Sequence, residues 1–287
     1  MRIRSFDEEK AILYLVATPI GNLEDMTFRA VRILKEVDKI YAEDTRNSGV
    51  LLKHYNINSK LESYHEFNQD LKSDQILNEL KSGMKLAIIS DAGLPVISDP
   101  GYKIAKAVIA EGIAVSTIPG ASAGISALSA SGIAPMPYTF YGFLDSKKSK
   151  RVKELEDIKF VNNTIIFYEA PHRIEETLED MISVLGDRNA CLARELTKTY
   201  EEFLRDKASE LAKIDGLKGE MVLMVEGYKE EEMTSVDPHQ KIDELILLGS
   251  KPNQAIKEVA KLLNINRNEL YMSYLEYKNN KEWYYEF

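Results

Sequence analysis

Short apolar runs alternate with helical patterns along the first half of the chain. The run 11–18, AILYLVAT, is almost continuously apolar, and an amphipathic segment follows it at 25–37. The same order recurs at 86–89 with 102–111, and apolar residues return at 114–118 before another helical pattern. Strands that alternate with helices in this way form a mostly parallel sheet with helices packed on it. The first half is therefore predicted to be an α/β domain.

A second α/β unit is predicted after Pro135 and Pro137, which interrupt the chain. Its strands, apolar or aromatic in character, are expected at 139–144, 164–170, 189–197 and 219–227. A polar linker follows, and the rest of the chain reads as three short helices with a helix-turn-helix spacing. The predicted domains are 11–134 for the first α/β domain, 135–228 for the second, and 237–287 for a small helical extension.

The net charge and the single cysteine limit the class of protein. The 287 residues carry a formal net charge of −9, which argues against nonspecific coating of nucleic acid, because phosphate binding requires clustered Lys and Arg. Cys191 has no partner for an internal disulfide, which is typical of a reducing cytoplasm. No apolar run is long enough to span a bilayer, and the charged N-terminus lacks the apolar core of a signal peptide. We therefore expect a cytoplasmic protein without a membrane segment.

A loop rich in turn-forming residues follows the apolar run 86–89. Residues 90–101, SDAGLPVISDPG, contain two Asp, two Gly and two Pro, and a helical pattern begins directly after them. In α/β proteins, sites are usually built from loops that follow the carboxyl ends of strands. The alternative is an ordered connection without chemistry. The second half of this loop, 98–101, is expected to shape the loop and start the next helix.

Three charged clusters stand at the ends of other predicted strands, namely EDTR at 43–46, EAPHR at 169–173 and RELTK at 194–198. Arginine binds phosphate through paired hydrogen bonds, and a lysine beside a glutamate can deprotonate an alcohol if burial lowers its pKa. Each cluster alone is equally compatible with solvated ion pairs. Their shared position at strand ends favours one composite cleft.

No metal site is predicted, because the four histidines do not fall in HExxH or a similar spacing. The segment ATPIGN after the first apolar run matches neither GxGxxG nor a P-loop, so a dinucleotide site of the Rossmann type is unsupported. Its single glycine, Gly21, allows one close approach of the backbone to a ligand. A plain turn from strand to helix is the alternative.

Seven ordered motifs between about Ile12 and Gly227 resemble the tetrapyrrole methylase superfamily. They are LYLVATPIGNLEDMTFRA, AEDTR, SDAGLPVISDPG, PGASA, EAPHR, ARELTK and GEMVLMVEG. The third and fifth motifs are most similar to the branch that methylates the 2′-oxygen of a cytidine in ribosomal RNA, because the corrin and sirohaem methylases usually carry Gly-Asp-Pro in the first loop. The tail resembles the helical extension of that branch.

The resemblance implies two α/β domains with the cofactor cleft between them, and S-adenosyl-L-methionine bound there in a folded conformation. The implied substrate is 16S rRNA in the small ribosomal subunit, in its decoding region. The scheme requires no metal. The residues expected to bind the cofactor are Ile20, Gly21, Asp91, Gly93, Leu94, Ser122, Ala123, Tyr168, Ala193 and Met221.

Methyl transfer to a ribose also requires a group that takes the proton of the 2′-hydroxyl, because the sulfonium methyl is already electrophilic and the enzyme chiefly aligns the two reactants. Lys198 or Glu195 is the hypothesised base, and His172 is the second choice. The groups expected to hold backbone phosphates are Arg46, Arg173 and Arg194.

Two other functions share some of these features. A C-methyltransferase of uroporphyrinogen or a precorrin would have the same fold and cofactor, and a non-catalytic ribosome-assembly protein would bind RNA without methylating it. The clusters EDTR and EAPHR favour RNA, because they supply cations. A homodimer is expected as well. Basic residues are expected to gather at the cleft, around Lys147, Lys148, Lys150 and Arg151.

Overall fold

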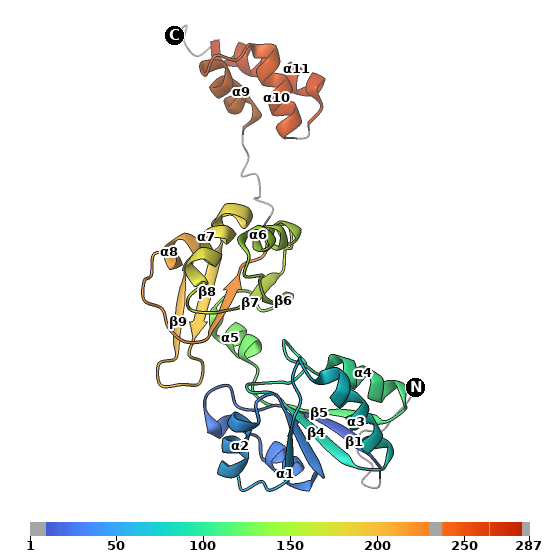
Figure 1. The fold of residues 1–287 in the computed structure, drawn as a ribbon. Coiled ribbons are helices and arrows are strands. Elements are labelled where there is room, and N and C mark those ends of the chain that lie inside the picture. Colours follow the sequence, from blue (N-terminus) through green and yellow to red (C-terminus); the bar gives the residue numbers. More distant parts are fainter. Residues whose placement is uncertain (1–9, 230–236, 264, 283–287) are drawn as a thin grey trace. The chain divides into compact units, whose positions relative to one another are not determined.

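The computed structural model describes residues 10–229, 237–263 and 265–282, and the chain divides into two compact units at residue 228. The first unit contains two five-stranded sheets with their helices, and the described residues of the second form helices without strands (Figure 1). Within the described residues, no helix is both long and apolar enough to cross a membrane.

The first sheet is parallel throughout and confirms the predicted α/β pattern (Figure 1). Its strand order is β3-β2-β4-β1-β5. The strands are β1 (Ile12–Val16), β2 (Lys39–Ala42), β3 (Lys60–Ser63), β4 (Lys85–Ile89) and β5 (Ala114–Ile118). The helices that connect them are a short 3-10 helix (Leu23–Asp25), α1 (Phe28–Glu36), α2 (Thr45–His54), α3 (Gln69–Lys81) and α4 (Tyr102–Ala110).

Alternate side chains of β1 enter two different cores. Tyr14 and Val16 pack in one cluster with Ile33 of α1, whereas Leu13 packs in another with Ile104 of α4. Since successive side chains of a strand point to opposite faces, both faces of this sheet are buried. That is why the run 11–18 is almost continuously apolar.

The position of β1 at the middle of three neighbouring strands determines where a site can form. β1 pairs with β4 on one side and β5 on the other. The loops 17–22, 90–101 and 119–122 therefore leave the sheet side by side at the carboxyl ends of these strands. Ligands of open α/β sheets bind in the crevice that such loops form.

The second sheet is mixed, with strand order β6-β7-β10-β8-β9. Only β6 and β7 are parallel, and the other neighbouring pairs are antiparallel. The strands are β6 (Tyr138–Phe143), β7 (Thr164–Glu169), β8 (Asn189–Arg194), β9 (Glu202–Lys207) and β10 (Met221–Val225). The helices α6 (Lys148–Asp157), α7 (Ile174–Leu185) and α8 (Ala208–Leu211) belong to this half (Figure 1).

Helix α5 (Ala123–Ser131) follows the first sheet in the chain but packs on the second sheet. Its residues Ala127 and Leu128 share a buried cluster with Ile166 of β7, Cys191 of β8 and Met224 of β10. Cys191 is completely buried there, as expected for a core cysteine. The crossing from one half of the unit to the other thus lies before α5, while the predicted bounds of the two α/β domains stay a prediction.

Several elements of the first unit do not stand out in the sequence. Strand β9 was missed because four of its six residues are charged and it lies at the sheet edge, where no apolar run is needed. Helix α2 was missed because Gly49 and several polar residues weaken its pattern. The short α8 follows β9 directly. Helix α6 starts at Lys148, within the basic segment 147–151.

The second unit consists of α9 (Pro238–Leu247), α10 (Pro252–Leu262) and α11 (Arg267–Glu282). A small core forms between the helices, and its members are Ile242, Ala255, Ile256, Val259, Ala260, Leu270 and Tyr274. Two of the helices begin with proline at their first position, where a missing backbone N–H costs nothing. Between α10 and α11, residue 264 lies outside the described residues.

Candidate functional site

A cavity of about 400 Å³ opens within the first unit, between loops of the first sheet and strand ends of the second. It is lined by eight of the ten residues predicted to bind a ligand: Ile20, Asp91, Gly93, Leu94, Ser122, Ala123, Tyr168 and Met221. Gly21 and Ala193 do not line it. Ala193 is fully buried behind the cavity wall, in the cluster that includes Ile20 and Val222.

The first wall of the cavity is the loop after β4, which is fastened to the end of β1. Thr18 and Gly93 exchange two backbone hydrogen bonds, of 2.9 and 3.1 Å. The Thr18 hydroxyl donates to the carbonyl of Ser90 at 3.1 Å, and the Ser90 hydroxyl donates to the carbonyl of Gly93 at 3.0 Å. Gly93 has φ +82°, a conformation that favours glycine, so the turn depends on this residue.

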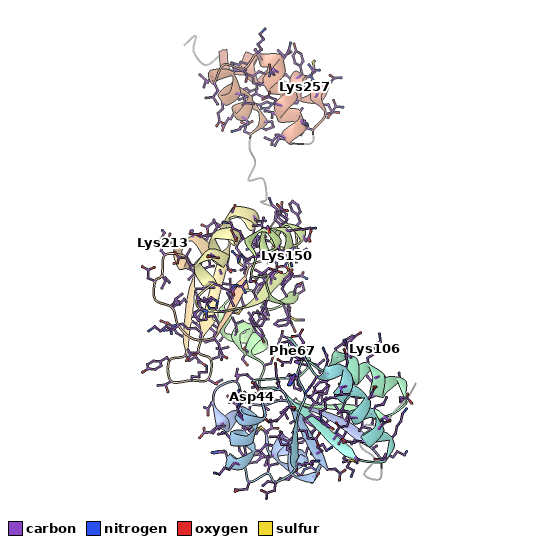
Figure 2. The ribbon with its side chains drawn as sticks, in the orientation of Figure 1. Asp44, Phe67, Lys106, Lys150, Lys213 and Lys257 are labelled. Atoms are coloured by element: carbon purple, nitrogen blue, oxygen red, sulfur yellow. The ribbon has the colours of Figure 1, made fainter. Side chains whose placement is uncertain are left out.

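Asp91 holds this loop to the start of α2. Its carboxylate accepts a hydrogen bond from the backbone N–H of Asp44 at 3.2 Å and one from the Asn47 side chain at 3.5 Å. Asp44 caps α2 and forms a 2.8 Å ion pair with Arg46, which keeps the pKa of Asp44 lowered to about 2. Asp44 lies beside α2 in Figure 2. Arg46 is thus an exposed cation that pairs with Asp44 and does not line the cavity.

Asp99 lines the cavity as well, although the sequence indicated only a role in shaping the loop. Its pKa is raised to about 6, first by burial and then by the nearby carboxylates of Glu43 and Asp91, while a hydrogen bond with Ser90 opposes the shift. Burial and Asp91 also raise the pKa of Glu43. This wall therefore concentrates negative charge. Among the described residues no cluster of His, Cys, Asp and Glu is arranged to hold a metal ion.

Lys198, which does not itself line the cavity, is held between two carboxylates. Its ammonium lies 3.0 Å from Glu195 Oε1 and 3.0 Å from Glu220 Oε2, and Glu220 lines the cavity. Burial lowers the pKa of Lys198, but the two carboxylates outweigh it and the pKa is raised. The net direction of the Lys198 pKa is thus opposite to the one that a lysine base would need. Lys198 in turn lowers the pKa of Glu195.

Gly21 makes room for this lysine. A Cβ atom on Gly21 would lie 2.6 Å from Cγ of Lys198 and 2.9 Å from Oγ1 of Thr197, both too close for real atoms. The absence of a side chain at Gly21 thus serves contact between the two halves of the unit. The predicted close approach at this glycine exists, but the approaching group is protein.

The EAPHR segment is a structural corner that lines the cavity through its first three residues. Glu169 is buried and accepts hydrogen bonds from the Thr177 hydroxyl at 2.7 Å and from the N–H of Ala170. Arg173 donates to the carbonyls of Leu144 and Asp145 at 2.9 and 3.1 Å. The guanidinium predicted to hold phosphate is therefore occupied by backbone at the end of β6.

Neither Lys198 nor Glu195 lines the cavity, and the same holds for Arg194 and His172. Arg194 is paired with Glu202 and also donates to the carbonyl of Lys218. His172 is exposed and does not line the cavity.

The basic segment 147–151 contributes less positive surface than predicted. Arg151 is only 1 % exposed and forms ion pairs with Asp180 at 2.7 Å and Glu176 at 3.3 Å. Lys148 pairs with Asp180 and Lys150 with Asp145, and Lys150 projects from α6 in Figure 2. The expectation that Arg151 belongs to a basic rim is wrong, because its buried guanidinium forms ion pairs that join α6 to α7.

Residues 12–212 match the family model described as Tetrapyrrole (Corrin/Porphyrin) Methylases. The chain is 48 % identical over 276 residues to ribosomal RNA small subunit methyltransferase I of Halalkalibacterium halodurans, which covers 93 % of this chain and 96 % of that protein. It is 50 % identical over 280 residues to the protein of the same name from Streptococcus pyogenes serotype M18, covering 94 % and 98 %. The protein of that name from Bacillus subtilis is 48 % identical over 276 residues, covering 93 % and 94 %.

Solved structures show the same fold at low sequence identity. Diphthine synthase superposes with a TM-score of 0.59 at 14 % identity, over 76 % of this chain and 90 % of that one. Uroporphyrin-III C-methyltransferase from Thermus thermophilus superposes with a TM-score of 0.54 at 19 % identity, over 76 % and 94 %. At these identities the likeness concerns fold alone.

Proposed function

Because this chain belongs to the tetrapyrrole methylase family, we propose that it transfers a methyl group from S-adenosyl-L-methionine to the 2′-oxygen of a cytidine in 16S rRNA of the small ribosomal subunit. The observation that carries this proposal is an identity of 48 to 50 % with ribosomal RNA small subunit methyltransferases I over more than nine-tenths of the chain. Residues 12–212, which match the family model, include most of the residues that line the cavity.

The cavity suits the proposed cofactor. S-adenosylmethionine carries a sulfonium and an α-ammonium, and the wall with Asp91 and Asp99 supplies negative charge for such cations. Ile20, Leu196 and Val222 offer apolar surface for a flat adenine ring. When bound, the cofactor supplies an electrophilic methyl group. In this proposal Asp99 binds the cationic end of the cofactor, whereas the sequence predicted only that it shapes the loop.

The protein must then accept the proton of the ribose hydroxyl. Lys198 is held as an ammonium by two carboxylates and so lacks a free lone pair for this task. Its positive charge instead favours an alkoxide that develops at the ribose oxygen. Glu195 remains the proposed acceptor, since it touches Lys198 and follows β8 directly, and His172 remains the second candidate.

The RNA contacts stay proposals. Arg46 is exposed and can exchange Asp44 for a phosphate, whereas Arg173 and Arg194 would first have to release protein partners. Lys147, at the N-cap of α6, adds an exposed cation. A homodimer is proposed as a way to widen the surface that meets the ribosomal subunit.

Mapping of ribose methylation by mass spectrometry tests the function. Small-subunit rRNA from a strain without this gene should lack one 2′-O-methylcytidine, and the wild-type chain should restore it. Methyl transfer to uroporphyrinogen with none to rRNA would instead identify a tetrapyrrole C-methyltransferase. RNA binding that is indifferent to S-adenosylmethionine, with no methyl group gained, would identify a non-catalytic assembly protein.

A further inference from the structure

Two half-exposed apolar side chains line the cavity from opposite halves of the first unit. Ile97 belongs to the loop after β4 and is 49 % exposed, and Phe143 ends β6 and is 56 % exposed. Large apolar groups in a cavity wall gain most when a ligand covers them, because burial removes their surface from water. Neither residue is used by the proposed contacts with the ionic parts of the cofactor.

Ile97 is presented by strained backbone. Its neighbours Val96 and Ser98 have φ values of +80° and +67°, in the left-handed region that β-branched residues such as valine rarely adopt. Gly101 leaves room for this shape, since Val96 Cγ2 lies 2.8 Å from the position that a Cβ on Gly101 would occupy. Such strain persists where the surrounding structure imposes it, and it concentrates at ligand-binding sites.

Phe143 is held in place by aromatic neighbours and by the backbone next to it. Its ring packs edge-to-face on Tyr168 at 5.5 Å between centroids, and the Tyr168 hydroxyl accepts a hydrogen bond from the N–H of Gly124. The carbonyl of Leu144, one residue further, is fixed by Arg173 at 2.9 Å. The ring is therefore ordered before any ligand arrives.

The two side chains line the same cavity, and the segments that carry them are neighbours. A Cβ on Gly142 would lie 3.6 Å from Oγ of Ser98, so the segments that carry Phe143 and Ile97 touch one residue away from each of them. An aromatic ring and an aliphatic side chain in the wall of one cavity can both cover a flat apolar-faced group. We define Ile97 and Phe143 together as the apolar clamp.

We propose that the apolar clamp holds the unstacked base of the nucleotide that is methylated. This inference rests on the proposed function. A ribose can enter a cavity of this kind only when its nucleotide leaves the surrounding stack, and the lost stacking must be replaced by protein. Aromatic side chains are the usual replacement, and stacking of this kind is tolerant of base identity. The competing occupant is the adenine of the cofactor, which is also flat.

The test compares the wild-type enzyme with Phe143→Ala, Phe143→Tyr and Ile97→Ala, using small subunits from a strain without this gene. Loss of the ring should raise KM for the subunit roughly tenfold or more, since stacking on an aromatic side chain is worth that much in affinity. Phe143→Tyr should keep the wild-type KM for the subunit, and Ile97→Ala should raise this KM less than Phe143→Ala does. Phe28→Ala is the matched control, because Phe28 is 98 % exposed and does not line the cavity.

Calorimetric titration with S-adenosylmethionine separates the two occupants. The clamp variants should bind the cofactor within about twofold of the wild type, and their thermal unfolding midpoints should match that of Phe143→Tyr. Weakened cofactor binding in Phe143→Ala with an unchanged KM for the subunit would assign the ring to adenine and overturn the proposal. Unchanged values in both assays would overturn it too.

Failure of the clamp and failure of the function give different results. A wild-type enzyme that methylates no small subunit overturns the proposed function and the clamp with it. A wild-type enzyme that methylates normally while Phe143→Ala keeps its KM for the subunit overturns the clamp alone.

Discussion

The ammonium nitrogen of Lys198 lies 3.0 Å from the carboxylate oxygen Oε1 of Glu195. The pKa of the lysine is raised and that of the glutamate is lowered, so each stabilises the charged form of the other. Stability from the raised lysine pKa is present below its unfolded value of about 10.4 and is lost as pH rises through the folded value. Stability from the lowered glutamate pKa is present above about 4.3 and is lost as pH falls through the folded value.

Lys198→Met should therefore impair the enzyme equally across neutral pH. The proposed charge stabilisation predicts a loss of kcat on the order of a hundredfold, with the same ratio to the wild type between about pH 6 and 9. The measurement is methyl transfer to small subunits at several pH values. If Lys198 acted as a base, the loss would instead grow as pH rises through the pKa of Lys198, because the amine becomes neutral there.

Gly21→Ala should displace the lysine without touching its charge. The added Cβ would lie 2.6 Å from Cγ of Lys198, so the side chain must move and its alignment with Glu195 is lost. Misplacement by about 1 Å can reduce the rate on the order of a hundredfold. Gly49→Ala is the matched control, since nothing lies within 4 Å of its added atom and the change sits in helix α2, where alanine is favoured.

Asp99→Asn should weaken cofactor binding, and the wild-type affinity should depend on pH. With a pKa of about 6, Asp99 loses its negative charge as pH falls below that value, so affinity for a cationic ligand should decline between about pH 7 and 5. Asp99→Asn should bind weakly at all these pH values. Titration calorimetry measures both, and Asp74→Asn, an exposed change in α3, serves as control. Equal pH dependence in wild type and Asp99→Asn would contradict the assignment.

Arg151→Met should destabilise the first unit. The substitution leaves the carboxylate of Asp180 buried without its 2.7 Å partner, which typically costs about 3 to 5 kcal/mol. Urea unfolding followed by circular dichroism measures the change. Lys153→Met, in the same helix, should have little effect, and adding Asp180→Leu to Arg151→Met should recover part of the loss. If Arg151→Met unfolded with the same free energy as wild type, the ion pair of Arg151 would not stabilise the fold.

The sequence predicts the parallel sheet well because its strands are buried on both faces. Leu13 and Val16 belong to different cores, so β1 has no polar side and stands out as an apolar run. The mixed second sheet is harder, since β9 is an edge strand whose charged residues reach solvent. Motif resemblance identified eight cavity residues, because the ligand loops have distinctive sequences.

The positions and pKa values of charged side chains were the hardest features to predict from the sequence. A run such as KKSKR does not reveal that Arg151 points inward to Asp180 while its neighbouring lysines remain outside. Likewise, the pKa of Lys198 depends on Glu220, which lies 22 residues away in the chain. Asp99 and Phe143 were missed as cavity residues because their importance comes from packing between loops, which spacing along the chain does not record.

Helix α5 ties the cavity to both sheets. Its first residue, Ala123, lines the cavity beside the first sheet's loops, while Ala127 and Leu128 are buried in the core of the second. Arg205 of β9 also grips the carboxyl end of this helix, at the carbonyls of Ala130 and Ser131. Any hinge that opens the cleft must therefore lie at 119–122, and α5 will travel with the second half. Ser122 would then be the residue whose backbone angles report whether the enzyme is open or closed.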